Sequence, residues 1–256
     1  MNTMEQSNSQ KILKVKNLTV AFDDNVVIDN LNFEVEKGEM LSVIGPNGSG
    51  KTVLVRALLG LAGFTGSVEW KKDIKIGYVP QHFFVESDTP LTVEEFFKFK
   101  TSKHAQIHKA LEQVGWQGST NPEHFEHHLK SHLLNQQLGK LSGGQLQRIL
   151  IAWSLIDNPD VLLYDEPTSG IDAGAEETIY STLLNLKDKY EMTIIFVSHE
   201  LSIVYNYATK VLCLNKEKFC YGEPEDILGA ENLSKLYGEK MKFYSHQHLQ
   251  NNFYDK

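Results

Sequence analysis

The sequence predicts an α/β fold with a parallel sheet, an antiparallel β subdomain at its N-terminal end and a helical subdomain inserted into the core. Residues 12–22 and 26–36 carry β-branched and aromatic side chains on either side of Asp23-Asp24-Asn25, a pattern typical of a hairpin. Residues 92–138 are rich in Glu, Lys, His, Gln and Leu and favour helices. From residue 161 onward, short apolar strands flank a helix expected over about 174–188, which indicates a parallel core.

The length and composition suit one large domain. The 256 residues are 41% hydrophobic and 23% charged, so we expect one domain over 12–244, with a helical subdomain at about 90–150. Polar tails are expected at 1–11 and 245–256. A net charge of -8 argues against general nucleic-acid binding.

Two further features bear on where the chain works. The apolar run at 149–156 is far shorter than the roughly 20 residues that cross a bilayer, and the polar N-terminus lacks the apolar core of a signal peptide. We therefore expect a cytoplasmic chain without a membrane span. Cys213 and Cys220 have no metal-type spacing, and in a reducing compartment we expect buried free thiols in place of a disulfide.

A complete phosphate-binding loop follows the apolar run at 39–44 and precedes a helical stretch that Gly60 closes; strand character resumes over 68–79. The loop fits GxxxxGK[ST] at each fixed position: Gly45, Pro46, Asn47, Gly48, Ser49, Gly50, Lys51 and Thr52, followed by Val53. The glycines let successive N–H groups face one point, and the helix adds its positive N-terminal end. Lys51 is expected to neutralise the β- and γ-phosphates of ATP, and Thr52 to offer its hydroxyl to Mg²⁺.

Two carboxylates complete this phosphate-loop NTPase site. Asp165 and Glu166 directly follow the apolar strand at 161–164, so both lie at the carboxyl edge of the sheet, where such folds bind ligands. Asp165 is placed to hold Mg²⁺. Glu166 lies one residue further along and can polarise the attacking water.

Leu141-Ser142-Gly143-Gly144-Gln145 is the five-residue signature of ATP-binding cassette (ABC) proteins, and the chain resembles that family over about 12–244. The resemblance implies a RecA-like core and gives roles to four further residues. Phe22 would stack on adenine, and Gln81 of the Q-loop would contact Mg²⁺ or the water. Asp172 belongs to the D-loop, and the switch histidine His199 would contact the γ-phosphate and the water. Each of these has an alternative reading. Phe22 could be core, His199 a packed histidine, and Gln81 a turn residue.

The signature makes physical sense as half of a split site. Ser142, Gly143, Gly144 and Gln145 begin a helix and form a second anion receptor, which one chain cannot aim at its own phosphate. In the family, two cassettes meet head to tail, and the signature and Asp172 of each contact the ATP of the other. ATP binding then closes the dimer and hydrolysis opens it.

The chain departs from the family pattern at two positions. Val53 replaces a hydroxyl residue that often follows the loop, which removes a possible contact to the α-phosphate. Trp153 replaces a common Arg, and we expect a change of packing there.

Within the family, the chain is most similar to the ATPase subunits of zinc, manganese or iron importers, on softer matches at 76–81, 92–96, 146–148 and 222–238. The resemblance implies a separate transmembrane permease, an extracytoplasmic metal-binding protein and a position on the inner face of the cell membrane. The alternatives are a soluble non-transport cassette and a regulatory cassette, which the presence of Glu166 and His199 disfavours. The spaced histidines are expected to be a solvated face: His104, His108, His124, His128 and His132.

Overall fold

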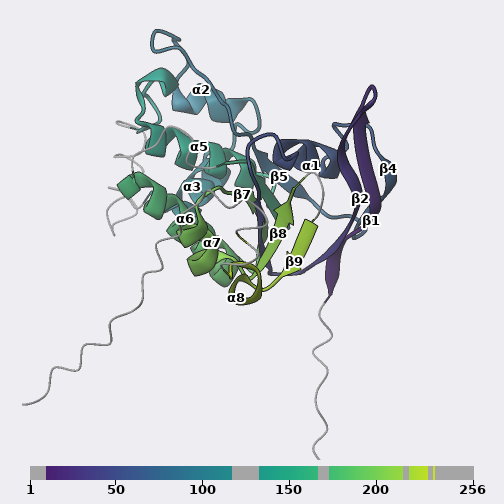
Figure 1. Cartoon of the computed structure of the whole chain (residues 1–256). Helices are drawn as coiled ribbons and strands as arrows, with labels where there is room; N and C mark the ends of the chain where they lie inside the picture. Colours follow the sequence, from purple (N-terminus) through teal and green to yellow (C-terminus); the bar gives the residue numbers. More distant parts are fainter. Residues whose placement is uncertain (1–9, 117–132, 167–172, 216–218, 230–232, 234–256) are drawn as a thin grey trace, which may run out of the picture.

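The N-terminal hairpin is present as expected. The computed structural model describes residues 10–116, 133–166, 173–215, 219–229 and 233. In it, β1 (Lys11–Phe22) pairs antiparallel with β2 (Asn25–Glu36) and, on its other side, with β4 (Thr65–Trp70). These three strands form a separate sheet at one side of the molecule (Figure 1).

The second sheet has six strands. Their order is β5 (Ile76–Val79), β6 (Val161–Tyr164), β7 (Thr193–Val197), β3 (Met40–Ile44), β8 (Lys210–Leu214) and β9 (Phe219–Gly222). The first five are parallel, and β9 adds to the edge in the antiparallel direction. The strand character expected over 68–79 therefore belongs to two strands in different sheets, because the chain turns at Asp73, whose φ is 61°.

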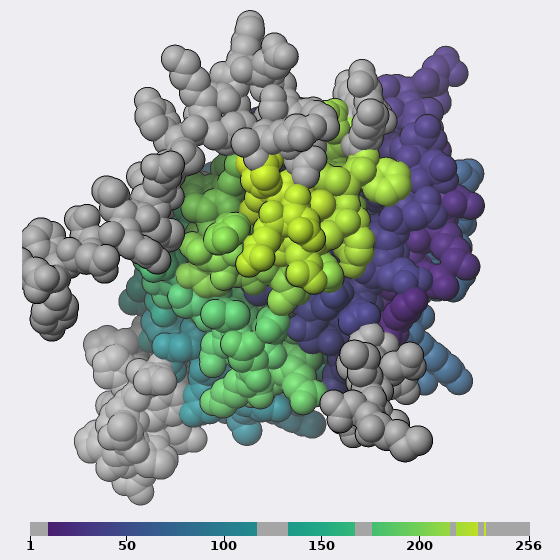
Figure 2. All heavy atoms as spheres, turned by 60° about the horizontal axis from the view of Figure 1, so that its bottom comes forward, coloured from purple at the N-terminus to yellow at the C-terminus, as the bar shows by residue number. Residues whose placement is uncertain are grey.

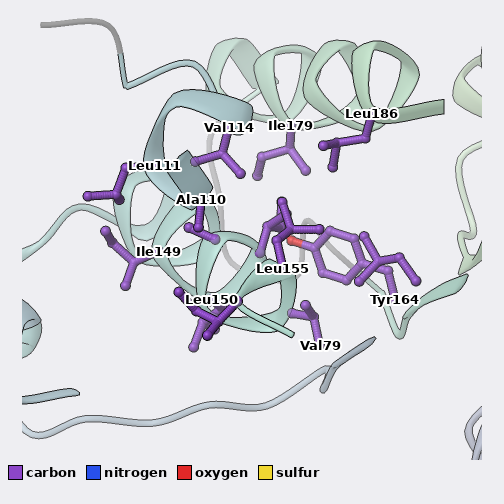
Figure 3. Packing of buried hydrophobic residues seen from close by; sticks show 14 of the residues in the cluster. Val79, Ala110, Leu111, Val114, Ile149, Leu150, Leu155, Tyr164, Ile179 and Leu186 are labelled. Atoms are coloured by element: carbon purple, nitrogen blue, oxygen red, sulfur yellow. The ribbon is translucent and has the colours of Figure 1, made fainter. Parts of the chain in front are cut away.

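Alternate residues of the central strands face two different cores, as the period of a strand requires. Val161 and Leu163 pack toward α1 (Lys51–Leu58) and the three-stranded sheet, whereas Leu162 and Tyr164 pack toward the helices of the opposite face. That second core is shown in Figure 3, where Tyr164 and Val79 meet side chains from three helices. These helices are α3 (His104–Gln113), α5 (Gly143–Leu155) and α6 (Ala173–Tyr190).

The expected helical insert lies between β5 and β6. Its described elements are α2 (Val93–Lys98), α3, a short 3₁₀ helix at Leu138–Lys140, and α5. Thr92 caps α2 by a reciprocal arrangement with Glu95, which explains why the helix begins there. His124, His128 and His132 lie outside the described residues.

Trp153 ties α5 to α2, which gives a physical meaning to its departure from the family pattern. Its ring stacks on Phe96 at 5.4 Å between centroids, and its Nε1 donates to the Phe96 carbonyl at 3.2 Å. Lys100 lies 4.3 Å from the centre of the Trp153 ring and bonds the Trp153 carbonyl.

The expectation of free thiols at Cys213 and Cys220 is wrong in this structure, which joins them by a disulfide. The two residues are register partners across the antiparallel pair β8 and β9, with Cα atoms 4.9 Å apart. Antiparallel partners bring their side chains within bonding reach. A reducing compartment and the absence of metal-type spacing predict free thiols. Neither criterion considers that cysteines seven residues apart can face each other across a hairpin.

The C-terminal strands lie against the N-terminal hairpin (Figure 2). Tyr221 of β9 donates to the Glu34 carbonyl of β2 at 2.5 Å, and its ring is 6.3 Å from that of Phe33. The remaining helices are α7 (Leu201–Tyr207) and α8 (Pro224–Ile227). Among the helices that the structure describes, none is long and apolar enough to cross a membrane. The N-terminal tail expected at 1–11 is shorter than expected, because β1 already begins at Lys11. Residues 1–9 and 245–256 lie outside the described residues.

Candidate functional site

The phosphate loop lies between β3 and α1, in the strand–loop–helix setting that its sequence predicts. Two of its glycines are required by close contacts. A Cβ on Gly45 would lie 2.2 Å from the carbonyl oxygen of Leu214, and one on Gly50, whose φ is 98°, would lie 3.0 Å from Val27. Only glycine allows the loop to curl this tightly against β8 and β2.

The loop forms one wall of a cavity of about 390 Å³. The residues that line it come from β2, the loop and α1, the segment after β5 and the end of β6, and they are Val27, Asn47, Gly48, Gly50, Lys51, Thr52, Val53, Gln81 and Glu166. The structure thus brings together residues that lie more than 130 positions apart in the sequence. Val27 is the lining residue that sequence reasoning missed, because an apolar residue in a hairpin gives no functional signal.

Lys51 is buried and lines this cavity. Its ammonium donates to the carbonyls of Gly45 at 3.0 Å and Pro46 at 3.3 Å, and lies 3.9 Å from Glu166 Oε1. Burial lowers the pKa of Lys51, while the carboxylates of Glu166 and Asp165 oppose that shift. The side chain is a desolvated cation among carbonyl oxygens and carboxylates, and it can neutralise a phosphate.

Thr52 and Asp165 form a pair suited to a hard cation. The Thr52 hydroxyl lies 3.5 Å from Asp165 Oδ1, while Asp165 Oδ2 is buried with no hydrogen-bond partner among the described residues. Burial raises the pKa of Asp165, and the hydrogen bond from Thr52 partly opposes the shift. An orphaned carboxylate oxygen beside a hydroxyl fits the oxygen ligands that Mg²⁺ prefers.

Glu166 follows Asp165 in a left-handed conformation, with φ at 47°. One of its carboxylate oxygens accepts a hydrogen bond from Gln81 Nε2, and the other faces Lys51. Non-glycine residues at positive φ are uncommon and cluster at functional sites. The conformation turns the Glu166 side chain into the cavity, away from the buried position of its neighbour.

The signature residues Ser142 to Gln145 do not line this cavity. Ser142 caps α5: its Oγ accepts from the amide of Gln145 at 3.3 Å, while Gln145 Oε1 accepts from the amide of Ser142 at 2.9 Å. Ser142 and Gly143 are exposed. A capped, solvent-facing start of a 13-residue helix has the geometry of an anion receptor open to another molecule.

The other expected site residues that the structure describes lie outside the lining of the cavity or within the loop. Phe22 ends β1 with 52% of its surface exposed, so it is no core residue. His199 is exposed just after β7, and Ser49 is buried within the loop. Neither Phe22 nor His199 lines the cavity. Asp172 lies outside the described residues.

Taken together, the fold and the paired carboxylates beside a phosphate loop define a phosphate-loop ATPase with a cassette signature. A model of the ABC transporter family matches residues 28–169, and the chain belongs to that family. The "Zinc import ATP-binding protein ZnuC" of Photorhabdus laumondii is 35% identical and aligns over 93% of this chain and 89% of its own. The protein of the same name from Ehrlichia canis is 36% identical, over 91% and 92%.

Solved structures agree with the sequence relatives. An inward-facing conformation of a metal-chelate type ABC transporter is 32% identical, with a TM-score of 0.77 over 89% of both chains. An ATP-binding cassette of an ABC transporter in its ADP conformation is 24% identical, with a TM-score of 0.72 over 90% of this chain and 99% of its own. At this identity the likeness supports the fold alone. The chain is an ABC ATPase.

Proposed function

We propose that this chain is the ATP-hydrolysing subunit of a divalent metal importer, with zinc as the first candidate and manganese or iron as the others. The observation that carries the proposal is the convergence of Lys51, Thr52, Gln81 and Glu166 on one cavity, with Asp165 behind Thr52. Support for zinc comes from relatives that match more than 90% of this chain and whose names state zinc import. These relatives also argue against a soluble non-transport cassette.

The residues of the cavity divide the chemistry among them. Lys51 and the amides of the loop bind the β- and γ-phosphates, and the exposed ring of Phe22 stacks on adenine. Thr52, Asp165 and Gln81 would hold Mg²⁺, which when bound would offset the charge of the phosphate oxygens. Glu166 orients the attacking water and accepts its proton, and His199 contacts the γ-phosphate.

The exposed signature supports a head-to-tail dimer. Ser142, Gly143 and Gly144 do not line the cavity of their own chain, so we assign them to the ATP of a second copy, together with Gln145 and Asp172. Each ATP then contacts both chains. Hydrolysis removes the γ-phosphate that holds the two chains together, so the dimer opens. A separate permease, to which the helical subdomain docks at the inner face of the cell membrane, and an extracytoplasmic metal-binding protein complete the system.

The test is growth under metal limitation. Cells that lack the gene should need added Zn²⁺, and wild-type chain should restore growth whereas Glu166→Gln should not. Glu177→Gln makes the same chemical change on the exposed side of α6 and serves as the matched control. If Mn²⁺ or iron relieves the defect and Zn²⁺ does not, the choice of zinc is wrong. If no metal relieves it, metal import is wrong.

A further inference from the structure

Two polar side chains meet inside a largely apolar core that also holds the buried Tyr180, whose hydroxyl lies 3.5 Å from Ser198 Oγ. The hydroxyl of Tyr164, which has no exposed surface, donates to Gln147 Oε1 at 2.8 Å, and Gln147 is only 9% exposed. Figure 3 shows the Tyr164 hydroxyl pointing toward α5, beside Leu155 and below Ile179. Burial raises the pKa of Tyr164 well above its ordinary value, so the hydroxyl keeps its proton and acts as a donor.

The pair joins the signature end of α5 to the end of β6 that carries the two carboxylates. Tyr164 is the last residue of β6 and directly precedes Asp165 and Glu166. Gln147 lies on the first turns of α5, two residues after the signature. The inference rests on the proposed dimer, in which these two ends serve different ATP molecules: the carboxylates act on the chain's own ATP and the signature on that of its partner.

The chain itself connects α5 to β6 only at the opposite end. Residues 156–160 join the end of α5 to the start of β6, so the signature end of the helix has no covalent connection to the carboxylate end of the strand. A 13-residue helix is about 20 Å long, which is the distance from the connection to the signature. Apolar packing lets a helix shift against a sheet, whereas a hydrogen bond in a low-dielectric core is directional and costly to break.

We propose that Gln147 and Tyr164 are positioning residues that tie the signature of each chain to its own Asp165 and Glu166, and so couple the two ATP sites of the dimer. Neither side chain lines the cavity proposed to bind ATP. When ATP pulls the signature toward the partner, the pair carries that displacement to the catalytic carboxylates. Occupation of one site then favours closure of the other, and the dimer hydrolyses ATP cooperatively.

The experiment compares full-length wild-type chain with Tyr164→Phe and with the double variant Tyr164→Phe/Gln147→Met. The single variant leaves a buried amide without its donor, so it should melt at a lower temperature. The double variant replaces both partners by apolar groups of similar size, which restores stability but not the link. The double variant is therefore the decisive one, and it keeps the test valid if the single variant folds poorly.

The assay is steady-state ATP hydrolysis against ATP concentration, with binding of a fluorescent ATP analogue to the monomer as a second readout. Wild type should give a Hill coefficient above 1. The double variant should give a coefficient near 1 and a turnover lower by roughly fivefold, the lower end of typical coupling between sites, with unchanged binding to the monomer. A double variant that melts like wild type and keeps both the Hill coefficient and the turnover would show a merely structural pair and overturn the inference alone. A wild-type chain that neither dimerises with ATP nor hydrolyses it cooperatively would overturn the split-site dimer and the inference with it.

Discussion

Asp165→Asn is expected to stabilise the nucleotide-free protein while ending catalysis. The wild-type carboxylate is fully buried, and its Oδ2 has no hydrogen-bond partner among the described residues. Its contact with Thr52 is long, at 3.5 Å, and burial raises its pKa. The folded state therefore carries a charged group that it solvates poorly, as expected if the position serves the proposed Mg²⁺ site at the expense of stability.

The size of the effect follows from that unpaired oxygen. An unsatisfied buried polar atom costs about 1–3 kcal/mol, and the amide of Asn recovers part of this by removing the charge while leaving its own donors to be placed. We expect a gain of about 1 kcal/mol in the free energy of unfolding, which for a chain of this size raises the melting temperature by roughly 2–4 °C.

The pH dependence of the unfolding free energy is a second test of the same reasoning about Asp165. Because the pKa of Asp165 is higher in the folded state than in the unfolded state, the folded state binds more protons through this group. The stability that Asp165 contributes is therefore fully present below its unfolded pKa, is lost as the pH rises through its folded pKa, and stays lost at neutral and higher pH. Asp165→Asn should lose this contribution, so its advantage over wild type should be largest at neutral and higher pH.

Thermal melting with and without nucleotide measures both effects. ATP and Mg²⁺ at about 100 times the dissociation constant add about 2.7 kcal/mol to wild-type stability, and this gain should shrink strongly in the variant. Asp29→Asn, at an exposed position of β2, is the matched control and should change neither quantity. If Asp165→Asn melted below wild type without nucleotide, the reasoning from an uncompensated buried charge would be refuted.

Three further changes test the rest of the site. Lys51→Ala should weaken ATP binding on the order of 10- to 100-fold in a fluorescence titration while the circular dichroism spectrum stays unchanged, and normal binding would contradict the role of Lys51. Glu166→Gln should slow hydrolysis by about two orders of magnitude and accumulate an ATP-bound dimer on sizing chromatography, which Ser142→Arg added to it should abolish; a dimer that survives Ser142→Arg would refute the split site. Cys213→Ser/Cys220→Ser should lower the free energy of unfolding by about 2.5 kcal/mol relative to the oxidised wild type, as expected for so short a closed loop, and two titratable thiols in denatured, unreduced protein would contradict the disulfide.

Much of this site could be predicted because its motifs are local. The strand, loop and helix around Lys51 are specified by neighbouring residues, and the apolar run before Asp165 places that residue at the edge of the sheet. The contacts of Gln81 with Glu166 and of Tyr164 with Gln147 could not be predicted, since they join elements that meet only after the helical insert has packed. Period-2 alternation indicates that Tyr164 faces one side of the sheet, but not which helix it meets there.

The disulfide shows a different limit of sequence reasoning. Cys213 and Cys220 are close because β9 turns back beside β8, and nothing in the composition of either strand fixes that register. The same strand β8 supports the phosphate loop: Cys213 pairs in register with Ile44, and the next carbonyl, that of Leu214, packs on Gly45. A covalent tie at the edge of the sheet therefore holds the strand against which the loop is formed, so its effect on stability should also be seen in ATP affinity.

The hydrogen bonds within the cavity indicate what ATP binding has to change. Lys51 donates to the Gly45 and Pro46 carbonyls, and Gln81 donates to Glu166, so the groups that should face phosphate, Mg²⁺ and water are bonded to one another. A γ-phosphate attracts Lys51 more strongly than two neutral carbonyls do, because a bond between two charged groups is the stronger kind. If ATP and Mg²⁺ bind as proposed, we expect Gln81 to give up its bond to Glu166, which would leave the Glu166 carboxylate free to accept a proton. Gln81 begins the segment that leads to α2. We therefore expect a movement of Gln81 to reach the helical subdomain, which we propose meets the permease.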